Sequence, residues 1–116
     1  MSSRSGSTSD FELGWLLRGD DVLAAVESRR SVTTGSLRGV AVVRSPGLVH
    51  TMGCPTALDL AWCSGDASRV EVRRTSRVAR GRVAPPILRG VLLVAAAGSF
   101  ERWQLRAGDC LEIRCG

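Results

Sequence analysis

The sequence predicts a mainly β (α+β) fold: a small compact barrel or sandwich of about seven strands with one or two short helices. Apolar, β-branched segments of strand length recur along the 116 residues, separated by short Gly, Pro, Ser and Asp clusters. Only a few segments have helical patterning, and they are short. A chain of this length builds one core, so we expect one domain over residues 12–116 and a disordered, Ser/Gly-rich tail over residues 1–11.

The first element has two interpretations. Apolar residues 13–18 and 22–27 flank Gly19-Asp20-Asp21, which is the arrangement of a β-hairpin. A helix from Asp20 to Arg30 fits the propensities equally well, because the aspartates can cap it and Leu23-Ala24-Ala25 favours helix.

The middle of the chain predicts three strands and a hairpin. The three strands are residues 40–44, 48–52 and 57–63, with a turn at 45–47 and an irregular segment at 53–56. The turn at residues 64–66 leads into residues 69–73, whose strict alternation directs Val70 and Val72 towards the core and the charged residues towards water.

The last third predicts a loop, a strand, a helix and a closing strand. Residues 76–86 are rich in arginine and contain Pro85-Pro86, so we expect an exposed loop. The remaining elements are a strand at 87–95, a helix at 99–105 capped by Ser99, a turn at 106–109 and a strand at 110–115.

The stretch from Val49 to Trp62 is the candidate site, because it holds the only histidine and a single acid within an apolar strand. Alternation places Leu58, Leu60 and Trp62 on a core face and Asp59 on the opposite face among small residues, where it could line a shallow pocket. If His50 lies nearby, the two residues could form an acid/base pair. The structural alternative is that Asp59 makes a hydrogen bond at a strand end and His50 is partly buried.

Charge suggests a second site. All sixteen basic residues are arginine, the net charge is +5, and seven arginines fall between Arg69 and Arg89 against the single acid Glu71. Arginines make the phosphate contacts that dominate affinity for nucleic acid, but no aromatic residue lies between Arg69 and Arg89 for base stacking. A solvated face is therefore the competing interpretation. The candidate polyanion contacts are Arg73, Arg74, Arg77, Arg80 and Arg82.

Composition excludes several classes. The absence of lysine excludes Schiff-base, Ser-Lys and P-loop chemistry, and no apolar segment reaches the roughly 18 residues of a membrane span. The start has no secretory h-region, which predicts a cytoplasmic location and reduced cysteines. The four cysteines have no zinc spacing, and we expect no metal and no cofactor.

Three segments together resemble a known family. They are Trp15-Leu16-Leu17-Arg18, then Val49-His50-Thr51-Met52-Gly53 with Leu58-Asp59-Leu60-Ala61-Trp62, then Gly98 to Leu105 with Arg106-Ala107-Gly108-Asp109. In order and spacing, residues 13–115 resemble the bacterial and archaeal domain of unknown function 192, in its actinobacterial-type variant. The resemblance implies a compact β-rich domain with a short helix near the start and another before the last strand. It favours the hairpin at residues 13–27, directs attention to His50 and Asp59, and implies no reaction, because the family has no established activity.

These patterns predict a small globular binding domain that is not an enzyme. Its shallow pocket would involve His50, Met52, Asp59 and Arg38 and would take a small polar ligand or a protein partner. One alternative is a polyanion or nucleic-acid binder acting through the arginine cluster. Another is a hydrolase-like enzyme that uses His50 and Asp59.

Overall fold

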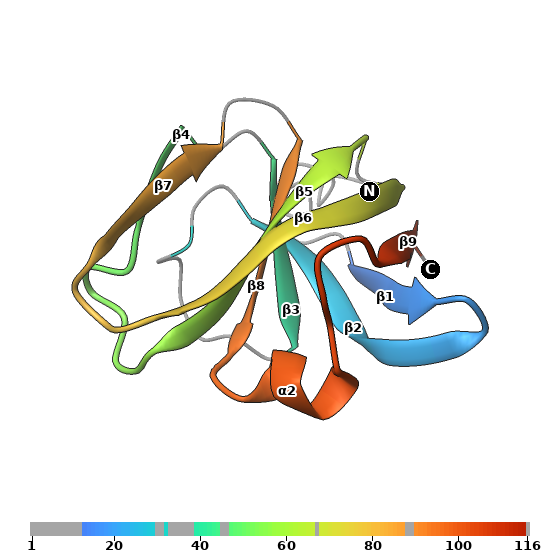
Figure 1. Ribbon diagram of the computed structural model, residues 1–116, viewed down its shortest axis with the longest axis horizontal. Coiled ribbons are helices and arrows are strands. Elements are labelled where there is room, and N and C mark those ends of the chain that lie inside the picture. The colour runs from blue at the N-terminus through green and yellow to red at the C-terminus, as the bar shows by residue number, and fades with distance from the viewer. Residues whose placement is uncertain are drawn as a thin grey trace, which may run out of the picture.

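Seven strands close into a barrel in the order β1-β2-β3-β8-β5-β6-β9, and β4 pairs with β7 in a separate two-stranded sheet (Figure 1). The computed structural model describes residues 13–29, 32, 39–44, 47–66, 68–87 and 90–115. The strands are β1 (Leu13–Arg18), β2 (Asp21–Arg29), β3 (Val40–Arg44), β4 (Gly47–His50), β5 (Leu58–Gly65), β6 (Arg69–Val78), β7 (Val83–Ile87), β8 (Val91–Ala96) and β9 (Cys110–Cys115). The helix α2 (Ser99–Trp103) follows β8 and lies at one end of the barrel (Figure 1). The predicted mainly β fold class is confirmed, and the predicted tail lies outside the described residues.

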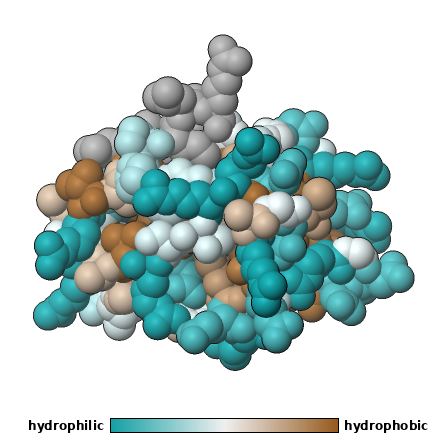
Figure 2. All heavy atoms as spheres, viewed as in Figure 1, coloured by the Kyte–Doolittle hydropathy of each residue, from teal (hydrophilic) through white to brown (hydrophobic). Residues whose placement is uncertain are grey.

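The barrel has a core inside it and a second core on its outer surface. Alternate residues of each barrel strand point inwards, such as Val91, Leu93 and Ala95 of β8. Leu92 and Val94 point outwards and pack with Val49 of β4 and Ala84 of β7, so the β4–β7 sheet covers this side of the barrel. Hydrophilic side chains dominate the face seen in Figure 2, with smaller hydrophobic areas between them.

β5 is covered on both sides, because one face packs in the outer core and the other faces the barrel interior. Leu58, Leu60 and Trp62 lie in the outer core, as predicted. Ala61 and Cys63, the small residues that alternation places on the same face as Asp59, point into the barrel interior and are buried there. Residues small enough for a pocket wall are also small enough for the crowded inside of a barrel, and alternation alone does not separate the two.

β6 contains a bulge that changes which residues face inwards. Val70 and Val72 are buried in the interior, as the alternation predicts. The pairing with β5 then shifts between Trp62 and Cys63, and Arg73 is the extra residue. Beyond the bulge Arg77 lies directly opposite Asp59, so the two side chains share a face of the sheet.

The hairpin interpretation of the first element is confirmed. β1 and β2 pair antiparallel from Leu13 opposite Glu27 to Arg18 opposite Asp21. The alternative helix from Asp20 to Arg30 is wrong, because β2 also pairs with β3 and completes the barrel. Tertiary pairing here overrides the helical propensity of the sequence.

The predicted loop over residues 76–86 is also wrong. Residues 76–78 belong to β6, which continues to Val78, and residues 83–86 belong to β7, which begins at Val83. The connection between the two strands is a short turn at residues 79–82. Pro85 and Pro86 are tolerated inside β7, because among the described strands it pairs with β4 alone and so keeps one free edge. Within the described residues, no helix is long and apolar enough to cross a membrane.

Candidate functional site

Asp59 caps α2 from the beginning of β5. Its carboxylate is buried, with 3% of the residue exposed, and Oδ2 accepts hydrogen bonds from the amides of Gly98 (3.0 Å) and Phe100 (3.1 Å). These amides lie at the start of the helix, where backbone N–H groups have no partner within the helix. The predicted cap, Ser99, makes no capping bond, and Gly98 is the N-cap residue. Asp59 supplies the cap from about forty residues away in the sequence.

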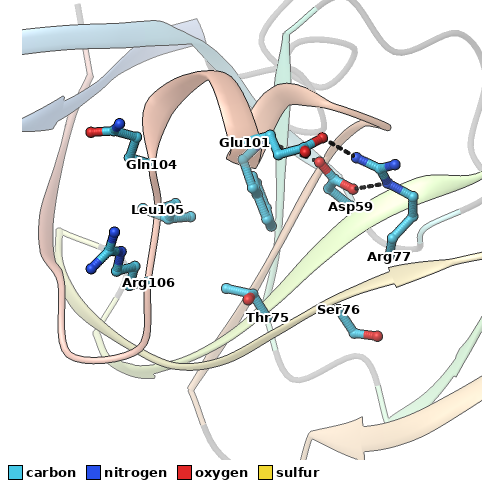
Figure 3. A pocket seen from close by; sticks show the side chains of 9 residues that line it. Asp59, Thr75, Ser76, Arg77, Glu101, Gln104, Leu105 and Arg106 are labelled. Atoms are coloured by element: carbon cyan, nitrogen blue, oxygen red, sulfur yellow. Dashed lines mark hydrogen bonds and ion pairs between the residues drawn. The ribbon is translucent and has the colours of Figure 1, made fainter.

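Arg77 joins Asp59 to the surface of α2. Its Nε donates to Oδ1 of Asp59 (3.1 Å) and its Nη2 donates to Oε1 of Glu101 (3.0 Å). These two hydrogen bonds, the one to Asp59 first, raise the pKa of Arg77 above its ordinary value. The arginine charge is therefore compensated by two carboxylates, and the three side chains form one ion-paired network (Figure 3).

An open groove of about 490 Å³ lies beside this network. The buried side chains of Phe100 and Leu105 form its apolar floor, while Thr75 and Arg77 of β6 form one wall. Figure 3 shows the side chain of Thr75 pointing into the groove and that of Ser76 pointing away from it. The groove is thus bounded by a strand on one side and by the segment from α2 to β9 on the other.

Arg106 contributes the available positive charge of the groove. Its side chain is exposed and lines the groove, and no hydrogen bond or ion pair engages its guanidinium within the part of the chain that the structure describes. Its backbone amide donates to Oδ2 of Asp109 (3.0 Å), which fixes the turn before β9. Asp109 also pairs with Arg18 (3.3 Å), so the position of the turn is fixed from two sides.

His50 and Met52 do not line this groove. His50 ends β4 opposite Val83, is half-buried, and accepts a hydrogen bond at Nδ1 from the amide of Met52 (3.3 Å). Met52 is 53% exposed. Arg38 lies outside the described residues. The structure therefore places Asp59 beside Arg77, which the sequence analysis assigned to the polyanion hypothesis. It does not place Asp59 in one groove with His50 or Met52.

The acid/base pair of the hydrolase hypothesis has no direct contact in the structure. Among the described residues, no hydrogen bond or ion pair joins His50 to Asp59, and both Asp59 oxygens accept from other donors. The contacts of Asp59 match the structural alternative, a hydrogen-bonded carboxylate near a strand end. His50 is partly buried, as that alternative states.

Thr51, next to His50, has a structural role that the sequence analysis missed. It is fully buried, and its Oγ1 donates to the carbonyl of Ala79 (2.6 Å) and accepts from the amide of Arg82 (3.0 Å). Its own amide donates to the carbonyl of Arg82 (2.8 Å). Thr51 thus fixes the β6–β7 turn, and a threonine between a strand and the Gly53 turn is the only sequence signal for this role.

The five arginines of the polyanion hypothesis differ in their surroundings. Arg73 pairs with Glu71 (3.7 Å), Arg77 is compensated as above, and the guanidinium of Arg74 lies 5.3 Å from the ring centre of Trp62. The register places Arg74 opposite this aromatic residue, which is distant in sequence. Arg80 and Arg82 are exposed in the turn, with no side-chain partner among the described residues. Two of the five are therefore free of both acidic and aromatic neighbours.

The described residues contain no metal-ligand group, and comparison with known proteins assigns no function to this site. Within the described ranges, no group of three or more His, Cys, Asp or Glu side chains could hold a metal ion. A scan against protein-family models, a search of curated proteins and a search of solved structures found no match to the chain. The resemblance to the domain of unknown function 192 stays a prediction.

Proposed function

We propose that the protein is a binding module that holds a polar ligand, or a polar segment of a protein partner, in the groove between β6 and α2. The observation that carries this proposal is a preformed groove of about 490 Å³ with an ion-paired wall and one unpartnered arginine. Its volume falls within the roughly 300–1,000 Å³ of ligand sites in proteins. Its position beside Asp59 supports one part of the predicted pocket, while His50 stays a separate candidate.

Arg106 favours a ligand with an acidic group. Asp59 and Glu101 already pair with Arg77, so an incoming anion would meet Arg106 as its cation. A carboxylate or phosphate accepts two parallel hydrogen bonds from a guanidinium, which gives orientation as well as affinity. The apolar floor would take the less polar part of the same ligand.

Native mass spectrometry of the purified protein tests this proposal. We expect added mass on the 12.4 kDa chain at low salt, reduced in Arg106→Ala and retained in Arg44→Ala. Arg44 is the matched control, because it is exposed at the end of β3, does not line the groove, and its loss changes the charge equally. A bare chain in all three proteins at low and moderate salt would contradict the proposal, as would equal loss of ligand in both variants.

Polyanion binding is a second candidate, supported by the free arginines of the β6–β7 turn. Arg80 and Arg82 are exposed without side-chain partners in the described part of the chain, and Arg74 lies near them in sequence on the same strand-turn unit. Affinity for a single-stranded oligonucleotide should then fall steeply with salt, and Arg80→Ala with Arg82→Ala should reduce the log–log slope by about 1.4. An unchanged slope in the double variant would exclude this turn as the binding surface.

A further inference from the structure

β6 has an open backbone edge along half of its length. On one side it pairs with β5 from Val70 to Val78, whereas on the other it pairs with β9 only from Arg69 to Glu71. Val72 still exchanges backbone hydrogen bonds with Gly108 (2.7 Å) and Asp109 (2.8 Å). Beyond Val72, no strand among the described residues pairs with this edge. Unpaired strand edges are templates for pairing with another chain.

The groove runs along this open edge. Three consecutive β6 residues, Thr75 to Arg77, line it, and Gln104 to Arg106 line the opposite side. Backbone N–H and C=O groups alternate between the two sides of a strand, so every second residue of β6 directs its pair towards the groove. An added strand would lie about 4.8 Å from β6, and three of its residues would span roughly 10 Å.

We propose that the occupant of the groove is an extended peptide of a partner protein, which adds to β6 as a further strand and places an acidic side chain on Arg106. This inference rests on the proposed function and names its ligand class. Main-chain hydrogen bonds to β6 would supply affinity, and alternate peptide side chains would face the floor of Phe100 and Leu105. Arg106 favours an acidic peptide, because it is the arginine of the groove that no acidic side chain pairs with among the described residues, whereas Arg77 is paired with Asp59 and Glu101.

The Asp59 network favours this mode of binding by keeping the groove open. Asp59 holds the start of α2, and Arg77 ties Glu101 of α2 to β6, so helix and strand edge are fixed at a set separation. A groove that exists before binding requires no ordering of the receptor when a peptide enters. Affinity is then limited mainly by the ordering of the peptide itself.

A random heptapeptide display library, panned on the full chain, provides the probe. We expect enrichment on the wild type but not on Thr75→Trp, whose indole would fill the groove where Thr75 points into it (Figure 3). Enriched peptides should carry Asp or Glu at one position. Circular dichroism would verify that the variant is folded, and Arg106→Glu, at an exposed position, serves as a second target that should lose enrichment.

Backbone N-methylation of an enriched peptide distinguishes strand addition from other binding modes. Methylation at alternate residues should weaken binding by about tenfold or more where the amide faces β6, and by less than about twofold where it faces away. Arg106→Ala should weaken the unmodified peptide about threefold, while Arg44→Ala should leave its affinity unchanged.

The outcomes separate this inference from the function on which it rests. Strand addition would be overturned if the wild type enriched no more peptides than Thr75→Trp and Arg106→Glu do. It would also be overturned if methylation weakened binding equally at every position of the peptide. The proposed function would survive that result if the added mass seen by native mass spectrometry still depended on Arg106. Loss of both signals would overturn the two together.

Discussion

Replacing Asp59 by alanine removes the acceptor for both amides at the start of α2. Loss of a helix N-cap costs about 1 kcal/mol of stability. The Phe100 amide lies in a buried bond, and a buried donor left without a partner costs about 1–3 kcal/mol more. The half-exposed Arg77 adds little, because solvent screens its ion pair. We therefore expect Asp59→Ala to lower the free energy of unfolding by about 2–4 kcal/mol.

Urea denaturation followed by circular dichroism measures this loss. The midpoint should fall while the m-value stays constant, which would show that stability rather than compactness has changed. Asp59→Asn keeps an acceptor oxygen and should lose about half as much. Glu101→Gln is the control: it breaks only the outer ion pair of Arg77, which is exposed, and should leave the midpoint unchanged. A loss below about 1 kcal/mol for Asp59→Ala would refute the capping role.

Three further predictions concern stability and thiol reactivity. Thr51→Val should lower the free energy of unfolding by about 1–3 kcal/mol, seen as a lower thermal midpoint, because the β6–β7 turn loses the hydroxyl that holds it. Thr51→Ser keeps the hydroxyl and should retain most of the stability. Equal losses in the two variants would contradict this role. Gly90→Ala should abolish cooperative unfolding, since its Cβ would clash with the backbone carbonyl oxygen of Cys63. Gly108→Ala, which also has positive φ but free space around it, should remain folded. Burial raises the pKa of Cys63 from 9.0 to about 12, so the thiol ionises at lower pH in the unfolded chain than in the folded one. The free energy of unfolding should therefore fall as the pH rises above about 9. A thiol reagent at pH 8 should label the exposed Cys110 and react with Cys63 only when the protein unfolds.

Local patterns were sufficient for most of the strands but not for how they pair. The alternation of Val70 and Val72 located β6 and its inward face correctly. The bulge at Arg73 leaves no sequence signal, because arginines on both sides of it are compatible with either face. β7 was missed since Pro85-Pro86 is typical of loops, and only its position in a two-stranded sheet explains the strand.

The site was predictable in part, for a related reason. A single acid in the apolar strand β5 identified Asp59, and its capping role matches one of the interpretations weighed from sequence. The partners of Asp59 could not be identified from sequence. The bulge sets the register that places Arg77 opposite Asp59, and the β8–α2 connection positions the Gly98 amide. Ser99 satisfied the local rule for a cap, and a more distant carboxylate took that place instead.

The pairing of β1 with β9 bears on the kinetics of folding. Gly14 lies opposite Cys115, so this contact joins the two ends of the described chain, whereas β1–β2 and β5–β6 are hairpins with short turns. The entropic cost of bringing residues together grows with the length of chain between them, so the hairpins should form early and the β1–β9 contact late. Until that contact forms, β1 and β9 both expose strand edges to neighbouring molecules. Refolding yield should therefore fall with protein concentration even where the native protein is stable.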